Sequence, residues 1–127
     1  MRKAIFTQAG ARPQGPYSQA VLSQGVHVWV SGQGPVDPET GELQLGTFRE
    51  QAELTFRNIG ALLEAAGATF AHVVKVSVHL ADLADFPELN EVYRQVFSDP
   101  YPARTTVQSG LNRIAIEVDC VAVLPEA

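Results

Sequence analysis

The stretch FRNIGALLEAAGATFAHVVKVSVHL, residues 56–80, contains the change of pattern that decides the fold. Up to residue 66 the apolar residues recur at helical spacing, which predicts a helix over 48–66. Thr47 stands three residues before Glu50, as in a capping box, and Gly67 follows where helices often end in a left-handed residue. From 73 to 80 the apolar residues alternate, which predicts a strand.

The same patterns predict the remaining elements on both sides of this stretch. A second helix is expected at about 86–98, with Asp85 as its cap and Pro87 in its first turn. Strands are expected at 17–23, 26–31, 104–109 and 114–123. The order strands, helix, strand, helix, strands is typical of an α+β domain with two helices on one face of a sheet. We expect one such domain over 1–127.

Alternation assigns several polar residues to the sheet face that the helices leave free. These are His27, Trp29, Ser31, Ser77, His79, Glu117 and Asp119. With a tryptophan and apolar neighbours such as Val121, this face is either half-hydrated or in contact with other subunits. We favour contact between subunits.

The composition limits the classes of protein to consider. Hydrophobic residues make up 46% and charged residues 18%, as in globular proteins. A net charge of −5 and scattered basic residues argue against a nucleic-acid binder. Cys120 is alone, and the three histidines show no short metal-ligand spacing, so neither a disulfide nor a metal site is expected. Without a signal peptide or a membrane-spanning run, the sequence predicts a soluble, cytoplasmic protein.

Two charged residues are the main candidates for chemistry. Arg104 follows the rigid segment PYPA and opens a strand, so its planar fork suits a carboxylate. The alternative is a structural ion pair. Glu117 lies in mid-strand and faces away from the helices, where a partly buried carboxylate can move protons. The alternative is a solvated strand face.

Weaker candidates surround these two residues. Gly32, after Ser31 at a strand end, lets its backbone N–H approach a ligand, or it only ends the strand. Tyr17 follows Gly15 and either donates a hydrogen bond or simply packs. Asn90 lies beside the apolar stripe of the second helix, as a site residue or a surface amide. The residues alone therefore indicate an α+β domain with a candidate carboxylate site.

Five segments in combination resemble the Rid family, the reactive intermediate deaminases also called YjgF-like proteins. They are GPYSQA (15–20), VSGQGP (30–35), NIGALLEAAGATFAHVVKVSVHLADLADFPELNEVY (58–93), YPAR (101–104) and IEVDCVAV (116–123). The resemblance implies a chorismate-mutase-like α+β fold and a homotrimer with sites in the clefts between subunits. It also implies hydrolysis of 2-iminobutanoate and 2-iminopropanoate to 2-keto acids and ammonia, which protects pyridoxal-phosphate enzymes. A protonated imine is already electrophilic, so we expect no cofactor.

The resemblance also implies roles for individual residues. Arg104 would clamp the substrate carboxylate and Glu117 would position or activate water. The remaining substrate-binding residues would be Tyr17, Ser31, Gly32, Asn90 and Thr106. Many members carry Cys where this chain has Thr106, which serves through its backbone N–H or changes substrate preference. The alternatives are a non-catalytic sensor of 2-keto or 2-imino acids and a chaperone-like interaction protein; RNA cleavage is the least favoured.

Overall fold

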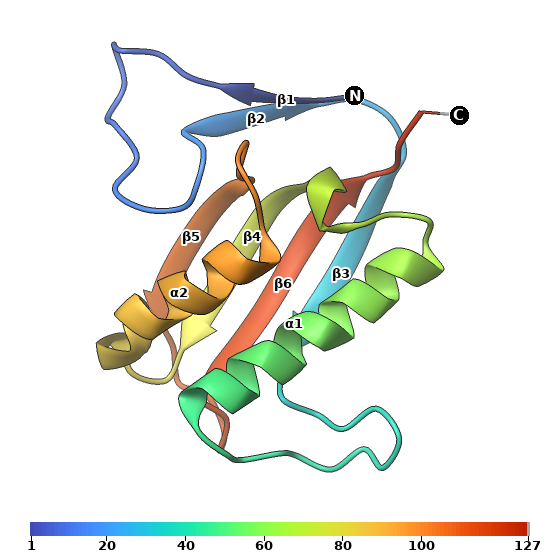
Figure 1. Cartoon of the computed structure of the whole chain (residues 1–127), viewed down its shortest axis with the longest axis vertical. Helices are drawn as coiled ribbons and strands as arrows, with labels where there is room; N and C mark the ends of the chain where they lie inside the picture. Colours follow the sequence, from blue (N-terminus) through green and yellow to red (C-terminus); the bar gives the residue numbers. More distant parts are fainter. Residues whose placement is uncertain (127) are drawn as a thin grey trace.

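A computed structural model describes residues 1–126 and has two helices on one face of a four-stranded mixed sheet (Figure 1). The strands are β3 (His27–Gln33), β4 (Val73–Leu80), β5 (Ala103–Gln108) and β6 (Ile116–Val123), in the order β3-β6-β4-β5. β4 and β5 are parallel, and the other two pairings are antiparallel. The predicted α+β class is confirmed.

A two-stranded ribbon stands at one end of this sheet (Figure 1). It consists of β1 (Arg2–Ile5) and β2 (Ala20–Ser23), which pair antiparallel. The predicted strand 17–23 is real but starts later, and β1 is absent from the prediction. A four-residue strand shows too little alternation to be recognised until its partner is known.

Helix α1 (Phe48–Ala65) begins and ends as its sequence predicts. The Glu50 N–H donates to Thr47 Oγ1 over 3.2 Å, and the Thr47 N–H donates to Glu50 Oε1 over 3.0 Å. These hydrogen bonds with Thr47 lower the pKa of the Glu50 carboxyl. At the other end Gly67 has a φ of 86°, and the Ala68 N–H donates to the Leu63 carbonyl over 2.9 Å. This is a Schellman motif.

Helix α2 (Phe86–Val96) begins differently from the prediction. The Asp85 side chain makes no capping hydrogen bond. Instead, Asp82 Oδ1 accepts the Ala84 N–H over 2.8 Å and caps the short 3-10 helix η2 (Leu83–Asp85), which leads directly into α2. Asp85 is therefore the last residue of η2 and directly precedes the first residue of α2. Because η2 leads into α2, the start of α2 needs no capping hydrogen bond from the Asp85 side chain.

The core lies between the helices and the sheet. Fully buried side chains from both layers form it: Phe56, Ile59, Leu63, Leu89 and Tyr93 from the helices, and Val76, Val78, Leu80, Ile116 and Val118 from the strands. The Phe56 ring meets the Tyr93 ring edge-on at 6.1 Å between centroids. This contact joins α2 to α1 and helps to fix which residues α2 presents to β5.

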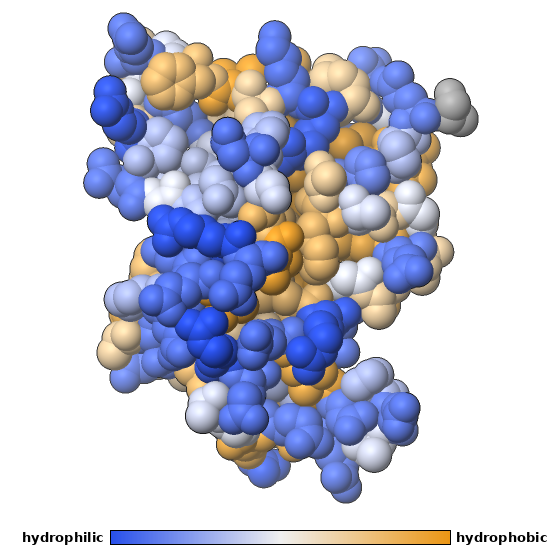
Figure 2. Space-filling view, in the orientation of Figure 1, coloured by the Kyte–Doolittle hydropathy of each residue, from blue (hydrophilic) through white to orange (hydrophobic). Residues whose placement is uncertain are grey.

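The outer surface of the helices is hollowed between α1 and α2, where Figure 2 shows apolar atoms between polar ones. The hollow has a volume of about 330 Å³ and is lined by Glu53, Phe56, Arg57, Phe70, Val92, Gln95 and Val96. None of the predicted site residues lines it.

Neither helix within residues 1–126 is long and apolar enough to cross a membrane.

Candidate active site

Arg104 is the second residue of β5 and lies on the sheet face that the helices cover. Its partner on β4 is Val76, which is completely buried. Arg104 Nη1 donates a hydrogen bond of 2.8 Å to Asn90 Oδ1, so α2 supplies the nearest polar contact. Arg104 and Asn90, which the sequence predicts as separate site residues, are thus brought together by the tertiary structure.

Three aromatic rings surround the guanidinium of Arg104. Its Cζ atom lies 4.8 Å from the ring centre of Tyr93, 5.6 Å from Phe86 and 5.7 Å from Tyr17. Ring faces attract a cation and exclude water at these distances. Tyr17 was predicted as a site residue, whereas Phe86 and Tyr93 were not, because both belong to the pattern of the helix.

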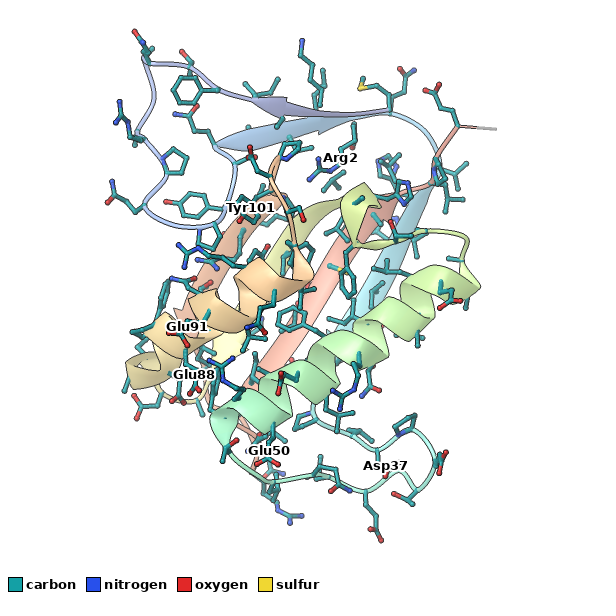
Figure 3. The ribbon with its side chains drawn as sticks, in the orientation of Figure 1. Arg2, Asp37, Glu50, Glu88, Glu91 and Tyr101 are labelled. Carbon is teal, nitrogen blue, oxygen red and sulfur yellow. The ribbon has the colours of Figure 1, made fainter. Side chains whose placement is uncertain are left out.

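The guanidinium of Arg104 is partly buried without an acidic partner. Within residues 1–126 no carboxylate oxygen lies within 4.0 Å of it. The acids of α2, Glu88 and Glu91 (labelled in Figure 3), pair with Arg49 instead. Burial lowers the pKa of Arg104 from its usual value, yet arginine stays charged at neutral pH. An unneutralised, preoriented guanidinium is a site for an anion.

Thr106 lies two residues beyond Arg104 on the same strand face. Its partner on β4 is the buried Val78. Thr106 Oγ1 is buried and has no hydrogen-bond partner within residues 1–126. The hydroxyl that this chain carries at position 106 is therefore not used by the fold.

Glu117 lies on the opposite face of the sheet. Its neighbours Ile116 and Val118 are completely buried on the helix side, so alternation turns Glu117 to the free face, as predicted. It is the cross-strand partner of His79 on β4. On the other side it lies over Gly32: a Cβ added to Gly32 would stand 2.9 Å from Glu117 Oε2.

Ser31 and Gly32 lie where the pairing of β3 with β6 is irregular. The register shifts between Val30 and Gln33, so the strand bulges at these two exposed residues. The missing side chain of Gly32 leaves the space that the Glu117 carboxylate occupies. This is a reason for glycine at position 32 beyond a freely accessible backbone N–H.

The predicted site residues therefore form two groups on opposite faces of one sheet. Tyr17, Asn90, Arg104 and Thr106 form what we call the arginine half-site, and Ser31, Gly32 and Glu117 form the glutamate half-site. Within one copy of the chain, Arg104 and Glu117 lie on opposite faces of the sheet.

The other side chains that could act as nucleophiles, bases or metal ligands are weaker candidates for chemistry. Cys120 is buried, and burial raises the pKa of its thiol to about 12, so it stays protonated at neutral pH. His79 Nδ1 lies 2.7 Å from Ser109 Oγ, and His79 Nε2 lies 3.9 Å from Asp119 Oδ2. No three His, Cys, Asp or Glu residues among 1–126 are grouped as metal ligands.

Comparison with known proteins places these features in a wider group. The profile of the family described as Endoribonuclease L-PSP matches residues 7–124. A human protein named 2-iminobutanoate/2-iminopropanoate deaminase is 40% identical over 125 residues, which are 97% of this chain and 90% of the human one. A RutC family protein of Pyrococcus abyssi is 46% identical over 123 residues, 95% of this chain and 96% of its own.

Solved structures are similar over the whole length. RidA from the Antarctic bacterium Psychrobacter sp. PAMC 21119 superposes with a TM-score of 0.74 at 43% identity, covering 96% of this chain and 99% of that one. TdcF of E. coli with bound serine superposes with a TM-score of 0.72 at 37% identity, covering 97% and 99%.

Proposed function

Since the chain belongs to the Rid (YjgF-like) family, whose profile is described as Endoribonuclease L-PSP, we propose that it is an imine hydrolase. Its substrates would be 2-imino acids such as 2-iminobutanoate and 2-iminopropanoate, and its products 2-keto acids and ammonia. The observation that carries the proposal is the half-buried Arg104, which has no acidic partner within residues 1–126. Relatives named as 2-iminobutanoate/2-iminopropanoate deaminases support the choice of substrate.

Arg104 binds the substrate carboxylate in this mechanism. Asn90 occupies one nitrogen, Nη1, and fixes the plane of the guanidinium, which leaves other N–H donors for a bidentate pair. The rings of Tyr17, Phe86 and Tyr93 limit access of water and so strengthen the attraction between the charges. Holding the carboxylate places C2 of the imino acid at a defined position.

Glu117 moves the protons of the reaction. Water adds its oxygen to C2 of the protonated imine, and the carboxylate takes the proton that the water releases. The carboxyl then returns this proton to the nitrogen of the resulting carbinolamine. The C–N bond breaks, ammonia leaves, the hydroxyl proton is released and the keto acid remains. Substrate positioning and proton transfer are the two contributions required.

The two half-sites are joined by association of identical chains. The arginine half-site of one copy faces the glutamate half-site of the next, and the contact repeats around a closed homotrimer with three equivalent sites. The opposite placement of Arg104 and Glu117 supports this arrangement, as does Trp29 on the free face with 77% of its surface exposed. A cytoplasmic location stays a prediction.

Imine clearance by purified protein tests the proposal. An amino-acid oxidase generates 2-iminopropanoate or 2-iminobutanoate, and semicarbazide traps what remains. Arg104→Ala is expected to lower kcat/KM by about 30-fold or more, because the substrate carboxylate loses its charged partner. Arg104→Lys is expected to lose most activity too, since an ammonium lacks the fork. Arg57→Ala, which removes an exposed arginine of α1, is the matched control and should remain active.

Other results would lead to the alternatives. Binding of 2-oxobutanoate in a calorimeter without imine turnover by the wild type would indicate a sensor. Full turnover by Arg104→Ala would remove the carboxylate clamp from the mechanism. A cellular function that survives the same substitution would indicate an interaction protein.

A further inference from the structure

The amide of Gln19 closes the 6–19 loop that joins β1 to β2. Gln19 Oε1 accepts the Thr7 N–H over 2.7 Å. Gln19 Nε2 donates to the Thr7 carbonyl over 3.0 Å and to the Ala11 carbonyl over 2.8 Å. One side chain at the end of the loop therefore holds the backbone at its start and its middle.

The same loop forms a wall of the arginine half-site. The ring of Tyr17 lies beside the guanidinium, and its hydroxyl accepts the Gln14 N–H over 2.9 Å. A Cβ added to Gly15 would stand 3.6 Å from Arg104 Nη2 and 3.9 Å from Asn90 Nδ2. Gly15 and Tyr17 thus border the guanidinium together with Asn90 of α2.

Next to Gln19, the loop is attached to the chain that leads into β5. The Ser18 N–H donates to the Pro102 carbonyl over 3.1 Å, and Ser18 Oγ donates to the carbonyl of Tyr101, which Figure 3 labels. This attachment fixes only the end of the loop. Without Gln19, the first part of the loop keeps only short-range hydrogen bonds, such as those of the Ala9 and Gly10 N–H groups to Thr7, and ordering it opposes ligand binding.

We propose that Gln19 is a positioning residue, whose amide orders the 6–19 loop as a preformed wall beside Arg104. It acts through Gly15 and Tyr17 and does not itself touch the substrate. This inference rests on the proposed function, because its tests measure binding of the proposed imino-acid substrate and of the keto acid 2-oxobutanoate. It assigns the loop a role in affinity, and it predicts that loss of the three hydrogen bonds affects binding more than the chemical step.

Gln19→Leu tests this role by the division between KM and kcat. We expect KM for the imino acid and Kd for 2-oxobutanoate to rise about tenfold, with kcat changed less than about twofold. Gln8→Leu, the same substitution at an exposed glutamine of the loop, is the control and should leave both values unchanged. Gln19→Asn keeps the amide but shortens its reach. This variant should also raise KM, and it replaces Gln19→Leu in the test if the leucine variant fails to fold.

A double-mutant cycle with Tyr17→Ala separates positioning from a general loss of stability. If Gln19 acts through the wall, its substitution raises Kd much less when Tyr17 is already absent. Additive effects, or an unchanged KM in Gln19→Leu while Arg104→Ala is inactive, would overturn the inference and leave the proposed function intact. A wild type that neither clears imine nor binds the keto acid would remove the proposed function itself.

Discussion

At the scale of single residues, the surroundings of Arg104 select a guanidinium over other cations. A planar group 4.8 Å from the Tyr93 ring can stack while its edge donates to Asn90. The Tyr93 hydroxyl is buried without a hydrogen-bond partner in residues 1–126, and burial raises the pKa of Tyr93 well above its usual value. A neutral phenol under the guanidinium contributes its ring face without competing with a bound carboxylate.

The substitution Gly32→Ala tests the glutamate half-site, because it adds a single methyl group next to Glu117. Gly32→Ala would place a Cβ 2.9 Å from Glu117 Oε2 and 3.0 Å from its Cδ, so the carboxylate must move. The end of a flexible side chain moves at little cost to folding. We expect unfolding free energy to change by less than about 1 kcal/mol, while kcat falls about 10- to 100-fold.

Gly110→Ala is the control for this substitution, because no atom lies within 4 Å of its added Cβ. Steady-state kinetics and thermal unfolding of both variants provide the comparison. Equal kcat in the two variants would show that the position of Glu117 over Gly32 has no catalytic consequence.

At the scale of elements, the two helices are stabilised in different ways, α1 by capping of its ends and α2 by packing. Helix α1 carries its own capping box and Schellman motif, and its ends are therefore fixed by local residues. Helix α2 has no side-chain cap and is held by η2 before it and by packing of its buried residues Leu89, Val92 and Tyr93. Because α2 also presents Asn90 to Arg104, the site depends on packing more than on helix propensity.

Thr47→Ala is expected to lower the free energy of unfolding by about 1 kcal/mol, since it removes the N-cap of α1. In a thermal scan followed by circular dichroism this is a fall of about 3–5 °C in Tm. Asp85→Ala is the matched comparison, because the Asp85 side chain makes no capping hydrogen bond, and its Tm should change little. A larger fall for Asp85→Ala than for Thr47→Ala would reverse this assignment.

At the scale of the whole molecule, the two faces of the sheet differ in what they carry. The helices cover one face, and the other face is free. The covered face buries the core and carries the arginine half-site at its β5 edge. The free face carries Glu117 and leaves Trp29 77% exposed. Assembly of identical chains through the free face would bury apolar surface and complete the site at the same time.

Light scattering is expected to give three times the mass of the 13.7 kDa chain. Trp29 is the one tryptophan in the sequence, so its fluorescence reports on the free face alone. Emission should move to shorter wavelength as dilute chains associate, because the ring leaves water. A monomer that clears imine at the same concentration would contradict the shared site.

Local pattern was sufficient for those features that depend on residues close in the chain. The capping box of α1, the turn at Gly67 and the orientation of Glu117 all follow from spacings of a few residues. Arg104 and Asn90 were also recognisable as candidates, but only one at a time.

What the tertiary structure alone decided is which of these residues meet. Strand order and register place Arg104 under α2 and beside Tyr17, far away in the sequence, and place Glu117 on the other face. They also create β1, which needs β2 as its partner. Periodicity tells which face of an element is apolar, but not which element lies next to it, because that choice depends on packing between distant segments.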